Sequence, residues 1–190
     1  MNIRFVDINE DRSHLADIRA LYDSAFPEDE RAPFSVLIRG AKKGNVDFWS
    51  CTDSDEWVGL LYVVSLDDMS YIFYFAVDER KRGKGYGTAI LRAAQEVYEG
   101  HRLFLAIEEV DPKYDNYSER VKRQRFYENA GFALSGQKMQ EADTIYDLMK
   151  IGGPVTNREY RRLMRSFMGL RMLYIPIRIL EDQQADPFRT

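Results

Sequence analysis

A loop rich in glycine and basic residues is the segment of this sequence best suited to chemistry. It reads ERKRGKGYGTAIL at 79–91 and places three glycines among four basic residues, just before a predicted helix. Glycine has no Cβ, so a bulky anion can approach its backbone closely. The first turn of a helix leaves about four N–H groups unpaired, and their partial positive charge favours anions. The loop therefore predicts a cradle for a pyrophosphate group.

Two familiar phosphate-binding patterns do not fit this loop. A Walker A loop needs G-x-x-x-x-G-K-[ST], but Lys84 stands between glycines and no glycine lies at the required distance. The dinucleotide fingerprint G-x-G-x-x-G fails because another residue occupies the third glycine position in either frame. What the chain does contain is R-x-x-G-x-G at Arg82, Gly85 and Gly87, entered from a strand and opening a helix.

The elements that must position the cradle follow from the spacing of apolar residues. Alternating or continuous apolar runs bounded by turn residues predict strands, and apolar residues at helical spacing predict helices. Strands are predicted at 3–8, 46–52, 56–66, 69–77, 103–107, 132–140 and 144–151, and helices at 15–25, around 34–38, from about 88 to 98 and at 115–129. Antiparallel hairpins followed by strand-helix-strand crossovers predict a mixed α/β sheet, not a doubly wound parallel one.

Composition narrows the class of protein. The chain has 190 residues and a net charge of −4, which does not suggest a nucleic-acid binder, so any basic function must be local. Cys51 is the only cysteine, which excludes an intrachain disulfide and a thiolate metal cluster. No secretory signal is visible and the longest apolar runs are too short to span a bilayer. We expect a cytoplasmic protein with no nucleic-acid or membrane partner.

Two motifs together resemble a known family. FAVDERKRGKGYGTAIL resembles the acyl-CoA-binding motif of the GNAT superfamily of N-acyltransferases. QRFYENAGF, at 124–132, resembles the helix-ending stretch of that family, aromatic-Tyr-x-x-x-Gly-Phe. The resemblance covers roughly residues 2–151. It implies a GNAT-like acyl-CoA N-acyltransferase fold over 1–151 with a C-terminal helical extension over 152–190.

The resemblance also implies a site for acetyl-CoA as co-substrate. Backbone groups of the strand before the cradle would pair with the pantetheine arm, and the cradle would hold the pyrophosphate. The residues concerned are Phe75, Ala76 and Val77 for the arm, and Arg82, Gly83, Lys84, Gly85, Gly87 and Thr88 for the cradle. Tyr127 takes the position of the general acid, because a phenol with a reference pKa near 10 stays protonated at neutral pH. The alternative for Tyr127 is an ordinary core aromatic residue.

The base that must deprotonate the amine is less defined. Some family members carry a glutamate on the strand before the cradle, where this chain has aromatic residues at 71, 73 and 74. The next carboxylates are Glu108 and Glu109, which strand alternation sends to opposite faces, so only one can serve. A solvated acidic loop or a water path to the base remains open. No metal is expected, since neither His14 nor His101 lies in a motif.

The resulting functional hypothesis is an N-acetyltransferase that moves an acetyl group from acetyl-CoA to a primary amine of a small molecule or peptide. The alternative is a non-catalytic acyl-CoA-binding sensor. The segment 26–34 and the acidic residues near Glu108 could form a rim suited to a cationic amine. Polyamines, lysine side chains, aminoglycosides and peptide N-termini all stay open as acceptors.

The C-terminal extension begins with a capping box, TNRE at 156–159. The helix that follows has an apolar face and a face of four arginines. We expect it to dock on the domain or on a dimer mate in a homodimer, with its arginines in water; binding to membranes or acidic partners is the alternative. Residues 172–180 are too apolar for a free tail, so we expect them to pack.

Overall fold

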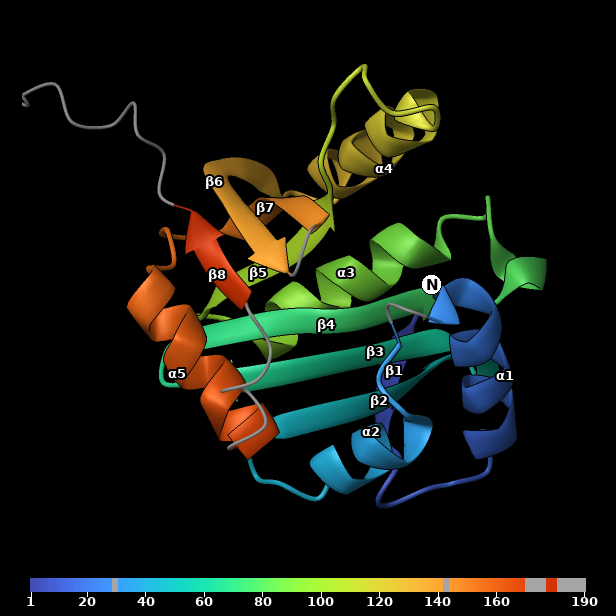
Figure 1. Cartoon of the computed structure of the whole chain (residues 1–190). Coiled ribbons are helices and arrows are strands. Elements are labelled where there is room, and N and C mark those ends of the chain that lie inside the picture. The colour runs from blue at the N-terminus through green and yellow to red at the C-terminus, as the bar shows by residue number, and fades with distance from the viewer. Residues whose placement is uncertain (29–30, 142–143, 170–176, 181–190) are drawn as a thin grey trace, which may run out of the picture. The chain divides into compact units, whose positions relative to one another are not determined.

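Figure 1 shows the computed structural model of the chain, which describes residues 1–28, 31–141, 144–169 and 177–180. The chain forms two compact units. Unit 1 contains 1–65 and 70–100, and unit 2 contains 66–69 and the chain from 101 onward.

Unit 1 carries four strands in the order β1, β2, β3, β4. β1 pairs antiparallel with β2, and β2 pairs antiparallel with β3. The β4 partner of β3 also runs antiparallel, because Ser65 bonds to Ser70 at one end and Asp78 N–H donates to the Val58 carbonyl at the other. The strands are β1 (Ile3–Asp7), β2 (Val46–Asp53), β3 (Glu56–Leu66) and β4 (Met69–Val77), and the helices are α1 (Leu15–Ala25), α2 (Phe34–Gly40) and α3 (Tyr86–Val97).

The core of unit 1 is aromatic. β3 is buried from Trp57 to Val64, as expected for a central strand with a continuous apolar run. Tyr22 and Tyr74 meet edge to face with ring centroids 4.9 Å apart, and Phe48 and Tyr62 do so at 5.0 Å. These rings fix α1 against the strands that lead to the cradle.

Unit 2 carries the strands in the order β5, β7, β6, β8, with every neighbouring pair antiparallel. The apolar face of its last helix is buried in this unit. The strands are β5 (Arg102–Glu108), β6 (Ala133–Glu141), β7 (Thr144–Ile151) and β8 (Ile177–Leu180), and the helices are α4 (Tyr117–Asn129) and α5 (Asn157–Met168).

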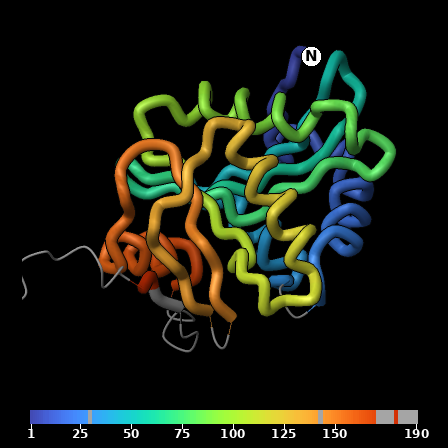
Figure 2. The backbone as a smooth tube through the Cα atoms, turned by 90° about the horizontal axis from the view of Figure 1, so that it is seen from above, coloured from blue at the N-terminus to red at the C-terminus, as the bar shows by residue number. Residues whose placement is uncertain are grey.

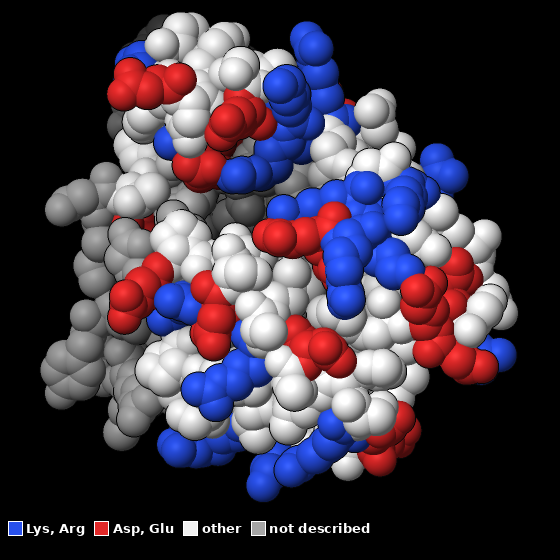
Figure 3. All heavy atoms as spheres, turned by 90° about the vertical axis from the view of Figure 1, so that its right-hand side faces the viewer, with Lys and Arg blue, Asp and Glu red and all other residues white. Residues whose placement is uncertain are grey.

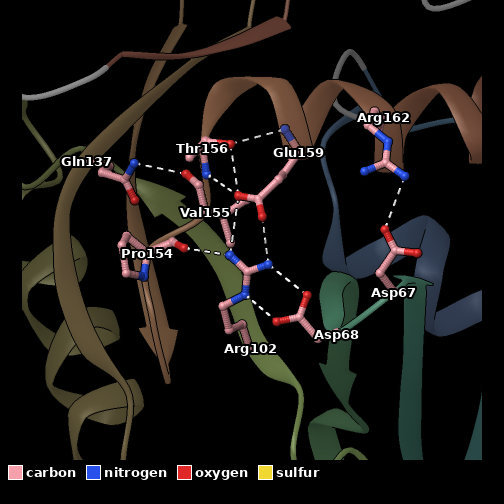
Figure 4. A network of polar contacts seen from close by, with 9 residues as sticks. All are labelled: Asp67, Asp68, Arg102, Gln137, Pro154, Val155, Thr156, Glu159 and Arg162. Carbon is pink, nitrogen blue, oxygen red and sulfur yellow. Dashed lines mark hydrogen bonds and ion pairs between the residues drawn. The ribbon is translucent and has the colours of Figure 1, made fainter.

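One arginine joins the start of β5 to the N-terminus of α5 (Figure 4). The Arg102 guanidinium donates to both oxygens of Asp68 and to Glu159, with distances of 2.8 Å, and to the Pro154 carbonyl at 2.8 Å. Glu159 also closes the predicted capping box with Thr156. These bonds, Arg102 first, lower the pKa of Glu159 to about 2, so the network is fully charged at neutral pH.

The predicted mixed α/β class and the order of elements are confirmed, with two adjustments at helix starts. α3 begins at Tyr86 instead of near Thr88, because Gly85 caps it in a left-handed conformation. α4 begins at Tyr117, two residues later than predicted. Within the apolar segment 172–180, β8 pairs with β6; the rest of that segment lies outside the described residues.

Candidate active site

The cradle begins where β4 ends. Asp78 is buried, accepts a hydrogen bond from the Arg80 N–H at 2.9 Å, and pairs with the Arg80 guanidinium. The Arg80 side chain is the main cause that lowers the pKa of Asp78. This carboxylate fixes the short 3₁₀ turn Glu79–Lys81 that leads into the glycines.

Two of the three glycines need their conformational freedom. Gly83 and Gly85 have φ of +73° and +86°, in the region that side chains with a Cβ rarely adopt. Gly87 already lies in the first turn of α3. The Met1 methyl group lies 3.6 Å from where a Gly85 Cβ would stand, so the N-terminal segment runs beside the start of α3 (Figure 2).

The first turn of α3 has no side-chain cap. Gly85 is the N-cap residue and supplies no acceptor, and the first intrahelical bond runs from Ala89 N–H to the Gly85 carbonyl at 3.0 Å. The preceding N–H groups of the turn stand at the positive end of the helix. They are therefore available to an anion.

Full positive charges border this helix end. Arg82 is exposed and anchors its Nε on the Val77 carbonyl at 3.2 Å, while Lys84 is exposed with no ion pair to a described residue. Arg82 also lies 3.6 Å from the Glu79 carboxylate. Figure 3 shows one face of the chain, on which Lys and Arg side chains lie among Asp and Glu side chains. The cradle is therefore both open and positively charged.

Gly59 in β3 allows an unusually close approach of β4. A Cβ at this position would lie 2.3 Å from the Ala76 carbonyl oxygen and 3.2 Å from the Val77 Cα. Beside it the β2–β3 register shifts, which leaves Val58 as an extra residue in the ladder. Gly59 thus sets the path of the stretch 75–77 predicted to meet the acyl donor. Sequence reasoning missed Gly59, although a glycine inside an apolar strand often marks a place where another backbone comes close.

Tyr127 lies near the C-terminal end of α4 among aromatic rings. It packs edge-on against Phe126 and Phe132, with centroid distances of 5.0 and 6.1 Å. Burial raises the pKa of Tyr127 to about 12, although Arg123 acts in the opposite direction. Its hydroxyl forms no hydrogen bond with the described residues. Tyr127 is therefore a protonated phenol whose O–H donates no hydrogen bond to a described residue.

Glu109 is a buried, fully paired carboxylate. It accepts from the Lys113 and Lys138 ammonium groups, each at 2.6 Å, and from the Tyr114 hydroxyl at 2.9 Å. These donors, Lys113 first, lower the pKa of Glu109 to about 2. A carboxylate held this firmly in its charged form is a weak base at neutral pH.

Glu108 meets a different set of donors on α4. Its carboxylate pairs with Arg120 at 3.0 Å and with Arg123. Arg120 is nearly buried, donates to the Glu109 carbonyl at 2.8 Å and stacks over the Tyr114 ring at 3.8 Å. The two neighbouring glutamates thus serve two separate clusters, and Arg120 ties the start of α4 to the end of β5. Neither glutamate is hydrogen-bonded to Tyr127 in the described part of the chain.

The segment between α1 and α2 is tied to the aromatic core of unit 1. The Tyr22 hydroxyl donates to the Ala32 carbonyl at 2.9 Å, and the Ala32 N–H donates to the Tyr74 hydroxyl at 3.1 Å. Arg31 pairs with Asp23 at 2.8 Å. The described part of the predicted acceptor rim, which omits 29–30, is therefore held in place by its backbone at Ala32.

Other reactive groups do not form a second site. Burial raises the pKa of the Cys51 thiol, which keeps it protonated and inert. Among the described residues, no cluster of His, Cys, Asp and Glu could hold a metal ion. No helix in that part of the chain is long and apolar enough to cross a membrane.

The family model of the GNAT acetyltransferase domain matches residues 44–134, which include the cradle and both glutamates as well as Tyr127. This segment of the chain therefore carries a GNAT acetyltransferase domain, as the two motifs indicate. The protein is thus an acyltransferase enzyme, and its predicted fold is confirmed. No curated protein matches the chain in sequence.

Solved structures share this GNAT fold at low identity. A GNAT-family protein from Bacteroides thetaiotaomicron is 19% identical with a TM-score of 0.67, covering 90% of this chain and 98% of its own. A spermidine N-acetyltransferase chimera from Vibrio cholerae and hSSAT is 14% identical with a TM-score of 0.61, covering 80% and 95%. An aminoglycoside 6'-N-acetyltransferase complexed with coenzyme A is 17% identical with a TM-score of 0.55, covering 82% and 100%.

Proposed function

We propose that this GNAT enzyme transfers an acetyl group from acetyl-CoA directly to a primary amine of a small molecule or peptide. The observation that carries the proposal is the uncapped, glycine-lined start of α3 beside Arg82 and Lys84. A helix end of this kind binds pyrophosphate through backbone N–H groups and charge together. A similar fold has been solved with coenzyme A, which supports the choice of donor.

The residues fit an acyl-CoA. The cradle residues from Arg82 to Thr88 would hold the pyrophosphate, because the space where a Gly83 Cβ would stand is open and the first turn of α3 has no side-chain cap. The backbone of Phe75, Ala76 and Val77 would pair with the pantetheine arm, and one of its N–H groups would face the thioester oxygen. When bound, acetyl-CoA supplies the activated acyl group.

We propose Tyr127 as the group that assists departure of the thiolate. Full proton transfer from a phenol of pKa about 12 to a thiolate of about 8.5 is uphill by about 5 kcal/mol. The hydroxyl therefore acts chiefly by donating a hydrogen bond to sulfur as charge develops, and solvent completes the protonation. Its unused donor supports this role.

Of the two candidate bases, we favour Glu108. Glu109 has all its acceptor capacity engaged by two ammonium groups and a phenol, and its pKa lies near 2. Glu108 is paired with Arg120 and with the exposed Arg123, and its carboxylate is more exposed than that of Glu109. A water molecule beside Glu108 is the simplest path for the amine proton.

The acceptor class we propose is a cationic amine. The first support is the acidic residues of the segment 26–34, which include Glu28. The second is that solved neighbours act, by their titles, on spermidine and on aminoglycosides, which both carry several amino groups. The acceptor itself stays open among the classes that the sequence suggests.

The test is acetyl-CoA turnover against a panel of polyamines, aminoglycosides, lysine peptides and peptide N-termini, followed as free thiol. We expect turnover with at least one amine. CoA binding without turnover on any amine would favour the acyl-CoA sensor instead.

Tyr127→Phe tests the role of Tyr127, because it removes only the hydroxyl and keeps the aromatic ring. It should lower kcat roughly 10²- to 10⁴-fold, the usual share of an acid–base group, with little change in CoA affinity or melting temperature. A fully active Tyr127→Phe enzyme would remove Tyr127 from the mechanism.

A further inference from the structure

The helix α5 presents four arginines on one side. They recur at spacings of three, four and seven residues, so they share one helix face. All four are exposed in the structure. We call the set the α5 arginine face; it consists of Arg158, Arg161, Arg162 and Arg165.

The apolar side of α5, opposite the arginines, is buried in unit 2. Tyr160, Leu163, Met164 and Phe167 are each no more than 6% exposed within unit 2. The capping box and Arg102 also fix the N-terminus of the helix (Figure 4). The arginine face is therefore held toward solvent and cannot rotate inward.

Most of this positive charge lacks a partner in the described part of the chain. Arg162 pairs with Asp67 at 3.2 Å, whereas Arg158, Arg161 and Arg165 form no ion pair with a described residue. Together with Asn157 the four arginines line an open hollow of about 600 Å³. Such a concentration of cations is unusual in a chain whose net charge is −4.

The residues that line the hollow favour a phosphate-bearing strand over a membrane or a protein as its anionic partner. Helices that insert into membranes use their apolar face, which is buried here. Protein interfaces usually centre on apolar or aromatic anchors, and none of the described residues that line this hollow is apolar or aromatic. Arginine forks match phosphate oxygens in pairs. The helical rise places Arg158 and Arg165 about 10 Å apart along the axis, enough to contact more than one phosphate of a strand.

We propose that the α5 arginine face binds the phosphate backbone of a nucleic-acid strand without reading its bases. Among the described residues, the lining includes no aromatic side chain on which a base could stack. This inference does not rest on the proposed acetyltransferase function. It revises our expectation that the protein has no nucleic-acid partner. That expectation came from the net charge of the whole chain, whereas these arginines are concentrated on one helix.

The test is fluorescence anisotropy of labelled single-stranded RNA and DNA of one sequence, with the full chain, at about 50–200 mM salt. Four neutralised phosphates predict that log K falls with log salt at a slope of about −3 for a single strand. Arg161→Gln with Arg165→Gln should bring the slope to about half and weaken binding at least tenfold. RNA and DNA should bind alike, since only phosphates are contacted.

Lys122→Gln with Arg125→Gln is the matched control on α4. Both residues are exposed and form no ion pair with a described residue, and this variant changes the net charge equally. It should bind like the parent chain. The proposal fails if oligonucleotides do not bind, if both double variants lose affinity equally, or if saturating CoA displaces the strand. It also fails if one polymer is strongly preferred, or if only phosphatidylserine vesicles bind.

Discussion

Replacing Gly59 by alanine should disturb the donor site, because the new side chain would press on Ala76, part of the strand predicted to meet the donor, although Gly59 is not itself a predicted ligand. The new Cβ would lie 2.3 Å from the Ala76 carbonyl oxygen, where an ordinary contact is roughly 3.5 Å. β4 or β3 must therefore move by about 1 Å. Both partners are backbone atoms in a buried ladder, so no flexible side chain can absorb the change.

Two effects should follow from that displacement. Overpacking of a well-packed interior costs about 1–3 kcal/mol, or a few degrees to about 12 °C in melting temperature for a chain of this size. A displacement of about 1 Å in the stretch 75–77 should lower kcat/KM for acetyl-CoA by up to about 10²-fold. The loss should appear in kcat/KM for acetyl-CoA, because the displaced stretch is the one predicted to meet the donor.

The assay is steady-state kinetics with acetyl-CoA varied, together with a thermal melt. Gly44→Ala is the control, since a Cβ at Gly44 meets nothing within 4 Å and its φ is not positive. It should leave both measurements nearly unchanged. If Gly59→Ala lowers the melting temperature but keeps the kinetics with acetyl-CoA, the close approach is purely structural and our reasoning about the donor path is wrong.

Four further outcomes are expected. Gly87→Val should abolish CoA binding by calorimetry while the fold survives, and unchanged affinity would refute the cradle. Turnover of Glu108→Gln should fall, most clearly at acidic pH, while Glu109→Gln keeps the parent pH–rate profile; identical profiles for both would exclude these carboxylates as bases. Because the pKa of Glu109 is lowered from 4.5 to about 2, its stabilisation is complete above pH 4.5 and is lost as pH falls toward 2. Glu109→Gln should therefore lower the melting temperature at pH 7 and much less near pH 2, and an equal loss at both would contradict the ion pairs. Arg102→Met should destabilise unit 2 by about 1–3 kcal/mol, since it removes partly exposed charged hydrogen bonds and leaves Glu159 without its main partner; a chemical denaturation curve that overlays the parent would refute the network.

The cradle could be predicted because its physics is local. Glycine conformational freedom, adjacent cations and the free amides of a first helical turn all lie within ten residues of sequence. The structure agrees at Gly83 and Gly85, whose φ values are positive, and at the uncapped start of α3. The strand order along the chain was predictable for the same reason, since periodicity is a property of short windows.

The role of the two glutamates depended on contacts that sequence does not encode locally. Alternation along β5 predicted that Glu108 and Glu109 face apart, but not that each would meet its own cluster of cations. Those partners come from residues up to 29 positions away, as Lys138 does for Glu109. Only the packing of α4 and β6 near β5 decided which carboxylate is buried.

The sequence by itself determined the family motifs, and it predicted the proposed cradle and the candidate acid Tyr127, because each of these rests on neighbouring residue types. Tertiary structure alone decided that Gly59 admits the Ala76 carbonyl and that β8 pairs with β6. Tertiary structure also decided that α5 turns its arginines outward. These are contacts between segments far apart in the chain, and their energies depend on distances of a few tenths of an ångström that composition and periodicity do not specify.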